Sequence, residues 1–203
     1  MRVAGQQAQA IKSANVNASQ IRLAVPQTLH LIQISPRLTP IEMSKTRCYL
    51  GMGGNLGNPL GLFDQVVVEL SNLAQTSNTK ESPRYESAPV DATGPNYVNS
   101  VLELDWTGSA HELLETCMNL ESVHGRVRST KNAPRLIDLD VLLFGNASIH
   151  SELLTVPHPR MHLRRFVLEP LLALDPEIEI PGLGQAALYL PKTLDQVITP
   201  LKA

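Results

Sequence analysis

Apolar and polar residues alternate with two different periods from residue 46 onward, and each period predicts one type of element. A helical period, with an apolar residue at every third or fourth position, predicts helices at residues 59–73, 110–125 and 166–174. A period of two, or a short apolar run between turn residues, predicts strands. The predicted strands are residues 47–54, 82–90, 96–106 and 135–145.

The order of these elements predicts the fold. Strand, helix, strand, strand, helix, strand is typical of the ferredoxin-like arrangement, in which helices cover one face of an antiparallel sheet. The other face is then left for a site. We therefore expect an α+β protein with a ferredoxin-like antiparallel sheet, helices packed on one face, and a C-terminal elaboration.

The helix predicted at residues 110–125 has recognisable ends. Ser109 can cap its first turn, and Gly125 is a natural stop at its C-terminus. This helix should pack on the sheet through one apolar face. The residues of that face are Leu113, Cys117, Leu120 and Val123.

The first predicted strand leads into a glycine-rich turn, GMGGNLGNP, at residues 51–59. The turn lacks the Gly-Lys-Ser/Thr ending of a P-loop, and Leu56 interrupts the glycine spacing of a dinucleotide-binding loop. We therefore expect the glycines to permit a close backbone approach between the first strand and its neighbour, with Asn55 turning the chain.

Residues 1–45 differ in composition from the rest of the chain. They are rich in Gln, Asn, Ser and Ala and show no sustained period, which predicts disorder. Their basic residues and lack of acids before Glu42 also fit a transit segment, whereas Met43 suggests a start at that position. We expect a disordered or mis-started extension at 1–45 and one catalytic domain at 46–203.

Composition and charge exclude several classes of protein. The 203 residues are 43% hydrophobic, which suffices for the core of one domain, and no apolar run approaches the about 18 residues of a membrane span. Beyond residue 41, 13 basic residues face 19 acidic ones, which argues against a general nucleic-acid surface. Cys48 and Cys117 lack metal or redox spacing, so both are expected to be reduced. We expect a soluble, cytoplasmic protein with no membrane and no nucleic-acid partner.

Two aspartates interrupt the apolar run RLIDLDVLLFG at residues 135–145. In a strand, Asp138 and Asp140 point to the same face, about 6.5 to 7 Å apart along the backbone. Neighbouring carboxylates repel one another unless a cation compensates, and hard oxygen ligands suit Mg²⁺. The pair therefore predicts a magnesium site, although a solvated strand face can carry the same pattern.

Basic residues on both sides of this strand add to the prediction. Residues 126–135 contain Arg126, Arg128, Lys131 and Arg135 and no acid, and residues 155–166 contain His158, Arg160, His162, Arg164 and Arg165. Guanidinium groups bind phosphate oxygens bidentately, while magnesium neutralises oxygens on the opposite side. A basic loop beside a carboxylate pair is thus typical of a polyphosphate site, and a solvated positive loop is the alternative.

Several motifs together resemble one known family. These are YLGMGGNLGNP, SPRYESAPV, NYVNSVLEL, LESVHGRVR, APRLIDLDVLLFG and LTVPHPRMHLRRFVLEPL, in this order over residues 47–180. They resemble 6-hydroxymethyl-7,8-dihydropterin pyrophosphokinase, an enzyme of folate biosynthesis. The resemblance implies transfer of the two terminal phosphates of ATP to the pterin hydroxymethyl group, with release of AMP.

The resemblance also implies roles for particular residues. Asp138 and Asp140 correspond to the ligands of two Mg²⁺ ions, and Arg126 and Arg135 to stabilisers of the phosphates of the co-substrate ATP. The positions implied to lie at the nucleotide are Glu121, Arg128, His158 and Arg164. The positions implied to line the pterin slot are Ser87, Val90, Tyr97, Asn99 and Phe166.

The chain departs from the family pattern at three points. Gly54 stands where a serine is usual, Arg165 stands where small residues are frequent, and Asn132-Ala133 replaces a common tryptophan and glycine.

Two other functions remain open at this stage. A metal-dependent nucleotidyltransferase would release pyrophosphate and usually has a third carboxylate on an adjacent strand, for which Asp105 is the candidate. A module that binds an anionic effector would bind ATP without consuming it. For the pyrophosphokinase we expect small-molecule substrates, ATP and the hydroxymethyl dihydropterin, and a monomer.

Overall fold

The computed structural model describes residues 44–89, 94–125 and 135–202. The extension at 1–43 therefore lies outside the described residues, as do residues 90–93 and most of the basic loop 126–135. The three helices are α1 (Pro59–Ser71), α2 (Ala110–Val123) and α3 (Arg165–Leu174). The strands of the main sheet are β1 (Thr46–Gly54), β2 (Thr76–Glu81), β3 (Tyr85–Ser87), β4 (Tyr97–Trp106), β5 (Asp138–Phe144) and β10 (Ile198–Pro200).

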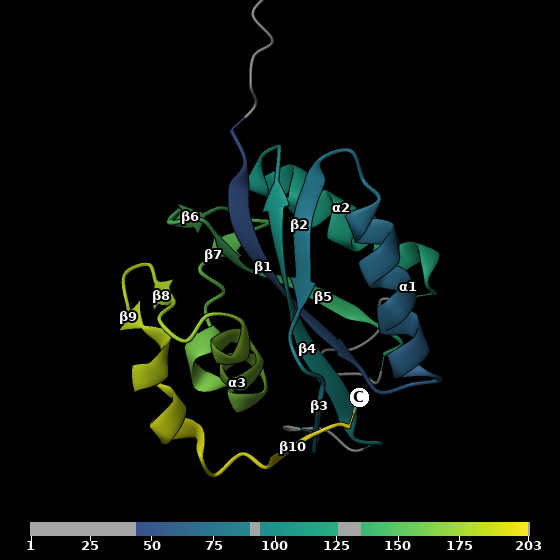
Figure 1. Ribbon diagram of the computed structural model, residues 1–203, viewed down its shortest axis with the longest axis vertical. Coiled ribbons are helices and arrows are strands. Elements are labelled where there is room, and N and C mark those ends of the chain that lie inside the picture. The colour runs from purple at the N-terminus through teal and green to yellow at the C-terminus, as the bar shows by residue number, and fades with distance from the viewer. Residues whose placement is uncertain (1–43, 90–93, 126–134, 203) are drawn as a thin grey trace, which may run out of the picture. The chain divides into compact units, whose positions relative to one another are not determined.

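The main sheet is antiparallel, and its strand order is β10-β3-β4-β1-β5, with β2 paired to β4 beside β3. Strands β1 and β4 form its centre (Figure 1). Two short hairpins follow, β6 (Ile149–His150) with β7 (Thr155–Val156) and β8 (Glu179–Ile180) with β9 (Gly184–Gln185). The predicted α+β class and antiparallel sheet are confirmed.

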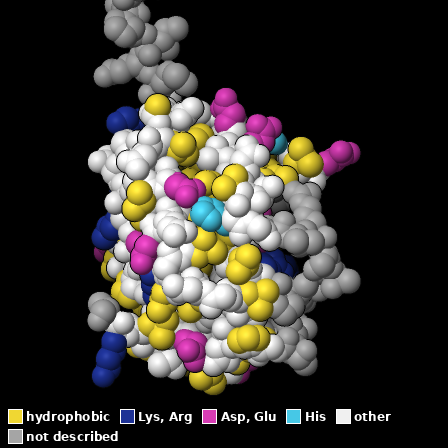
Figure 2. Space-filling view, turned by 90° about the vertical axis from the view of Figure 1, so that its right-hand side faces the viewer, with side chains coloured by type: hydrophobic (Ala, Val, Ile, Leu, Met, Phe, Trp, Pro, Cys, Tyr) yellow, Lys and Arg dark blue, Asp and Glu magenta, His cyan; other side chains and the backbone are white. Residues whose placement is uncertain are grey.

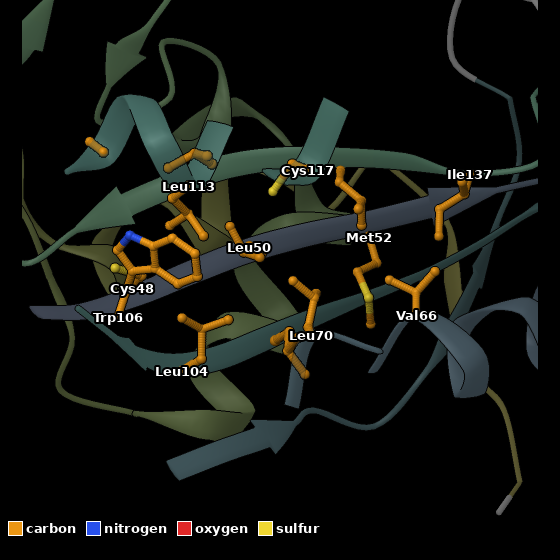
Figure 3. Close-up of a cluster of buried hydrophobic side chains, with 14 of the residues drawn as sticks. Cys48, Leu50, Met52, Val66, Leu70, Leu104, Trp106, Leu113, Cys117 and Ile137 are labelled. Atoms are coloured by element: carbon orange, nitrogen blue, oxygen red, sulfur yellow. The ribbon is translucent and has the colours of Figure 1, made fainter. Parts of the chain in front are cut away.

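Helices α1 and α2 cover one face of the sheet (Figure 1). The side chains of Cys48, Leu50 and Met52 on β1 point to this face and pack against both helices (Figure 3). Trp106 closes one end of this core and donates its indole N–H to the Ser109 carbonyl at 3.2 Å. The alternation of β1 thus supplies one of the two cores of the protein.

Helix α2 begins and ends where predicted, but the residues it buries differ in part from those predicted. Ser109 and Glu112 form a reciprocal capping box at the N-terminus, and Gly125 has a φ of +83° beyond the C-terminus. Val123, predicted to be buried, is 77% exposed, whereas Glu121 is only 3% exposed. The prediction was wrong at this end because α2 presents Glu121, rather than Val123, to strand β5.

Helix α3 packs on the opposite face of the sheet, against Tyr49, Val101 and Leu142 (Figure 1). The second face was expected to stay open for a site, and it is partly covered instead, because the C-terminal part of the chain folds back over it. Helix α3 covers only part of that face. The uncovered part is the place of the cavity described below.

Strand β2 was not predicted from the sequence. Its residues, TSNTKE, are polar and none of them is buried, so no apolar alternation marks it. Pairing with β4 at the edge of the sheet holds it in place.

The outer face of α1 and α2 shows apolar and acidic side chains mixed together (Figure 2). Among the described residues, no helix is long and apolar enough to cross a membrane.

The close approach predicted for the glycine turn occurs at Gly54, the last residue of β1. A Cβ atom at this position would collide with the carbonyl oxygen of Leu136. The next two amides, of Asn55 and Leu56, both donate to the carbonyl of Arg135, at 3.0 and 3.3 Å. Glycine at position 54 therefore lets the segment entering β5 lie directly against the end of β1.

Gly54→Ala should lower the free energy of unfolding by about 2 kcal/mol, because the added methyl group meets backbone that cannot rotate away. Gly53→Ala is the matched control, since its Cβ would meet only Asn99 Oδ1, at 3.6 Å. Urea unfolding of both variants measures the difference. Equal stability of the two variants would contradict the close approach at position 54.

Candidate active site

The cavity floor is made by glycines of the central strand. Side chains of β1 alternate, so Gly51 and Gly53 share the face of Tyr49, opposite the core under α1 and α2. Gly53 is paired with Asn99 on one side and with Asp138 on the other, and Gly51 is paired with Asp140. The missing side chains leave an open strip between the polar residues of β4 and those of β5.

This strip is the bottom of a cavity of about 300 Å³. Its walls come from β3, β4, β5, the segment leading into α3, and the C-terminal segment. The polar and charged residues that line it are Ser87, Tyr97, Asn99, Ser100, Arg135, Asp138, Asp140, Arg160, Arg164 and Gln196. The apolar residues and glycines that line it are Gly51, Met52, Gly53, Ala88, Leu142, Leu163, Phe166 and Val167.

Asp138 and Asp140 lie on the same face of β5, as predicted, because both line the cavity while Leu139 and Val141 are buried in the opposite core. Arg135 pairs with Asp138 at 2.8 Å between Nη1 and Oδ2. The side chain of Asp140 is 42% exposed and faces the cavity. The two carboxylates therefore form the acidic side of the site.

Asn55 fixes the position of Arg135. Its side-chain carbonyl accepts the Arg135 amide at 3.0 Å, and its amide group donates to the Pro95 carbonyl at 3.2 Å. Asn55 is 5% exposed, so these bonds are shielded from water. This buried side chain links the start of β5 to the loop before β4, a larger role than the turn predicted for it.

His158 enters the site from the loop after β7. Its amide donates to the Leu142 carbonyl at 2.9 Å, which places the residue beside β5. Its Nδ1 accepts the Arg160 amide at 3.2 Å, so a neutral ring carries its proton on Nε2, which lies 3.8 Å from Asp140 Oδ2. Burial and the charges of Arg164 and Arg160 lower the pKa of His158 to about 4. The imidazole is therefore neutral at pH 7 and presents an N–H toward the acidic side.

Arg164 lies across the cavity from the strand. Its Nη1 is 3.9 Å from Asp140 Oδ2, and its guanidinium carbon is 5.4 Å from the centre of the Phe166 ring. Burial and the nearby charge of Arg160 lower the pKa of the Arg164 guanidinium. Since positive neighbours disfavour both the Arg164 cation and a His158 cation, this flank has a positive potential suited to an anion.

The opposite end of the cavity is less charged. Asn99 donates from its side-chain amide to Ser87 Oγ at 2.9 Å, and both residues are almost fully buried. Tyr97, on the same face of β4 as Asn99, adds aromatic surface, and the Phe166 ring, which contacts the Arg164 guanidinium, lines the same cavity. An amide group held beside aromatic rings can bind the polar edge of a flat heterocycle.

The structure brings together most of the residues predicted for the site. Eight of the predicted residues line the cavity, and His158 lies beside it through its 3.8 Å approach to Asp140. The eight are Ser87, Tyr97, Asn99, Arg135, Asp138, Asp140, Arg164 and Phe166. Three others, Arg126, Arg128 and Val90, lie outside the described residues.

Glu121 is placed differently from these residues. It does not line the cavity, and its carboxylate accepts the backbone amide of Leu139 at 2.7 Å from the α2 side of the sheet. A carboxylate buried in this way orients β5, the strand that carries both aspartates. The helical period of α2 could have indicated this, because Glu121 follows Leu113 and Cys117 at intervals of four residues.

The sequence did not indicate three kinds of cavity residue. Gly51 and Gly53 were assigned to a turn, although their alternation with Leu50 and Met52 places them on one face. Arg160 was included in the basic segment 155–166, but the sequence predicted no role for it in the site. Gln196 carries no sequence signal, because it lies in a polar segment near the C-terminus and its position depends on tertiary contacts.

Asp105 is far from the aspartate pair. It lies opposite Arg47 in the pairing of β1 with β4, while Gly53 lies opposite Asp138 in the pairing with β5. Six residues of an extended strand separate these positions, about 20 Å. Asp105 instead pairs with Arg47 at 3.3 Å and accepts a bond from Asn78 at 2.6 Å. It is therefore not the third carboxylate that a nucleotidyltransferase site would need.

The donor set of the site fits magnesium. Within the part of the chain that the structure describes, no group of three or more His, Cys, Asp and Glu side chains could hold a metal by itself. Mg²⁺ does not need such a cage, because it commonly binds one or two carboxylates and completes its shell with water and phosphate oxygens. Asp138 and Asp140 beside a positive, anion-binding flank match that requirement.

Comparison with known proteins agrees with this geometry. The family model of 7,8-dihydro-6-hydroxymethylpterin-pyrophosphokinase (HPPK) matches residues 49–176. The chain belongs to the HPPK family. A 2-amino-4-hydroxy-6-hydroxymethyldihydropteridine pyrophosphokinase of Synechocystis sp. is 34% identical over 146 residues, which cover 72% of this chain and 75% of that relative. The protein of the same name from Pseudomonas aeruginosa is 37% identical over 136 residues, 66% of this chain and 84% of the relative.

A solved structure of Plasmodium falciparum HPPK-DHPS A437G with SDX-DHP shares the fold, with a TM-score of 0.61 and 13% sequence identity. The similarity covers 77% of this chain and 47% of that chain, so this chain spans about half its length. At this identity the comparison shows the HPPK fold alone.

Protonation of His158 should destabilise the protein. Because its pKa in the folded protein, about 4, lies below the ordinary value of 6.5, the unfolded chain binds the proton first. The stabilising contribution is complete above pH 6.5 and is lost as the pH falls through 4, by about 1 to 3 kcal/mol. Urea unfolding of the magnesium-free protein between pH 7 and 4, compared with His158→Gln, isolates this contribution. An NMR titration that gave an ordinary pKa for His158 would contradict it.

Proposed function

We propose that the protein transfers the terminal pyrophosphate of ATP to the hydroxymethyl group of 6-hydroxymethyl-7,8-dihydropterin, with Mg²⁺ and with release of AMP. Its family supports pyrophosphokinase activity in folate biosynthesis. The observation that carries the proposal is the division of one cavity into a charged end, with Asp138, Asp140 and Arg164, and an amide-and-aromatic end around Asn99.

At the charged end, Asp138 and Asp140 would hold two Mg²⁺ ions. When bound, these ions neutralise charge on the phosphate oxygens and hold the triphosphate in position. The Arg135 guanidinium is already within 2.8 Å of Asp138, so it can bind a phosphate oxygen close to the metal. Arg164 and Arg160 approach from the opposite wall. The triphosphate would thus be bound between positive charges on two sides.

At the other end, Asn99 is suited to the pterin. Its side-chain amide offers a donor and an acceptor to the pyrimidine edge, and its bond to Ser87 Oγ fixes its orientation. The ring can lie flat above Gly53, where no side chain intervenes, with Phe166 on the wall. Its hydroxymethyl group would then point along the glycine floor toward Asp138 and Asp140.

The reaction needs little covalent chemistry from the protein. The hydroxymethyl oxygen attacks the β-phosphorus and its proton passes to water, the bond from that phosphorus to the α,β-bridging oxygen breaks, and AMP leaves with the oxygen. Catalysis then comes from positioning and from neutralising the charge on the transferred group. The neutral His158 can donate its Nε2 proton to a phosphate oxygen in a hydrogen bond.

We also propose that the sheet is of the ferredoxin-like type. The strand order β3-β4-β1-β5, with a helix after β1 and after β4, supports this assignment. Arg126 and Arg128 are proposed to bind phosphates and Val90 to lie at the pterin, as the family resemblance implies. We propose a monomer that acts on small molecules.

Incubation with Mg-ATP and the hydroxymethyl dihydropterin should yield AMP and the pyrophosphorylated pterin, as separated by ion-exchange chromatography. Asp140→Ala should lower turnover at least about 1,000-fold, because charge neutralisation at the transferred group is lost. Asp105→Asn, at the far end of the sheet, is the matched carboxylate control and should keep its activity.

The products separate this function from the two alternatives. Release of pyrophosphate instead of AMP would favour nucleotidyl transfer. Binding of ATP without consumption would favour an effector module. Full activity of Asp140→Ala would remove the metal assignment.

Asn99→Leu should weaken pterin binding by about 10- to 100-fold, because the leucine keeps the volume but leaves the polar edge of the pterin unpaired. Affinity for a non-hydrolysable Mg-ATP analogue should change little. Fluorescence titration of the pterin and calorimetric titration of the analogue give the two constants. Asn96→Leu is the control, since Asn96 is exposed and bonds Glu86. Equal losses for both ligands would contradict the proposed division of the cavity.

A further inference from the structure

We propose that residues 196–201 form a strap that ties the two walls of the pterin end together, and that Gln196 is a positioning residue for pterin binding. The inference rests on the function proposed above. The strap lies beyond residues 49–176, the part of the chain that matches the family model. It contains β10, the outermost strand of the sheet, which lies beside β3 (Figure 1).

Gln196 attaches the strap to the wall that leads into α3. Its side-chain carbonyl accepts the Arg165 amide at 2.9 Å, and its side-chain amide donates to the Leu163 carbonyl at 2.8 Å. Both hydrogen-bonding ends of the side chain are therefore used on one short segment. Phe166 and Arg164, which line the cavity, belong to that segment.

Arg165 holds the same junction from the other direction. Its Nη1 donates to the backbone carbonyl of Gln196 at 3.1 Å, and its Nη2 pairs with Glu169 on α3 at 3.2 Å. Its buried Nε makes no hydrogen bond within the described residues, so these two contacts orient the guanidinium. Arg165 and Gln196 are thus joined by two hydrogen bonds, each between one residue's backbone and the other's side chain. These bonds restrict how the strap can lie against the segment before α3.

The other end of the strap is attached to the opposite wall. Strand β10 pairs with β3, with Ile198 opposite Ser87, and the Leu201 amide donates to the Arg84 carbonyl at 2.8 Å. Ser87 is the residue that accepts the bond from Asn99. Only two positions separate Gln196 from Ile198, so the strap connects the two walls by a short, extended piece of chain.

Arg84 anchors this second wall to the body of the protein. Its guanidinium binds Glu81 at 2.8 Å, Asp64 at 2.7 Å and the Leu60 carbonyl at 3.0 Å. Strand β3 is therefore paired with β4 on one side and with the strap on the other, and Arg84, just before it, ties its start to α1. Loss of the Gln196 bonds would release the α3 wall from this anchored strand.

The strap predicts a selective effect on the two substrates. The proposed pterin residues Ser87 and Phe166 come from opposite walls, and their separation depends on the strap. Asp138, Asp140 and Arg135 are positioned by β1, β5 and Asn55 without it. Arg164 is the one proposed phosphate ligand on the segment that Gln196 holds, so most of the described contacts proposed for Mg-ATP do not depend on the strap. Weakening the strap should therefore affect the pterin more than the Mg-ATP.

The test compares Gln196→Ala with Asp195→Ala, an exposed neighbour that does not line the cavity. Loss of two hydrogen bonds predicts a rise of about tenfold in the Kd for the pterin in Gln196→Ala, and a change of less than about twofold for a non-hydrolysable Mg-ATP analogue. Gln196→Glu keeps the acceptor for the Arg165 amide but loses the donor to the Leu163 carbonyl. Its Kd for the pterin should therefore lie between that of the wild type and that of Gln196→Ala. Asp195→Ala should match the wild type.

Hydrogen exchange tests the strap without reference to substrate. Gln196→Ala should speed amide exchange in residues 163–167 and 85–87 while that of β1 and β5 stays unchanged. An unchanged Kd for the pterin, or an equal loss of affinity for both ligands, overturns the positioning role. If the wild type binds no pterin, the proposed function fails, and exchange alone decides: faster exchange supports the strap, and unchanged exchange overturns it.

Discussion

Strand β1 has large side chains on one face and glycines on the other, and this asymmetry is the constraint on which the rest of the structure depends. Cys48, Leu50 and Met52 build the core under α1 and α2. Gly51 and Gly53, on the other face, leave the strip that becomes the cavity floor. Successive residues of a strand face opposite sides of the sheet. The nine residues of β1 therefore contribute apolar side chains to the core on one side and an open floor to the cavity on the other.

The neighbours of β1 then determine what the cavity can bind. Strand β5 brings two carboxylates to one side of the glycine strip, and β4 brings the buried amide of Asn99 to the other. Neighbouring charges of one sign repel, yet here Asp138 is paired with Arg135, and Asp140 faces Arg164 and the neutral His158. The cavity is thus electrostatically divided across the glycine strip, with charged groups on the β5 side and the neutral amide of Asn99 on the β4 side.

Much of this arrangement could be predicted from the sequence, because it depends on local periodicity. The alternation of β5 placed Asp138 and Asp140 together, and Ser109, a residue that can cap a helix, marked the start of α2. Strand β2 could not be predicted, because edge pairing rather than apolar alternation holds its polar residues. The position of α3 on the second face and the contacts of Gln196 depend on residues distant in sequence, which no local pattern encodes.

Strand β10 also has a consequence for how the protein meets other chains. It is a short outermost strand beside β3, and it ends with Pro200, which has no amide hydrogen to donate. An outer strand that is only three residues long and contains proline is a poor template for strand addition. The last residues of the chain therefore shield the polar backbone of β3 from intermolecular pairing, and in doing so protect this side of the protein from aggregation.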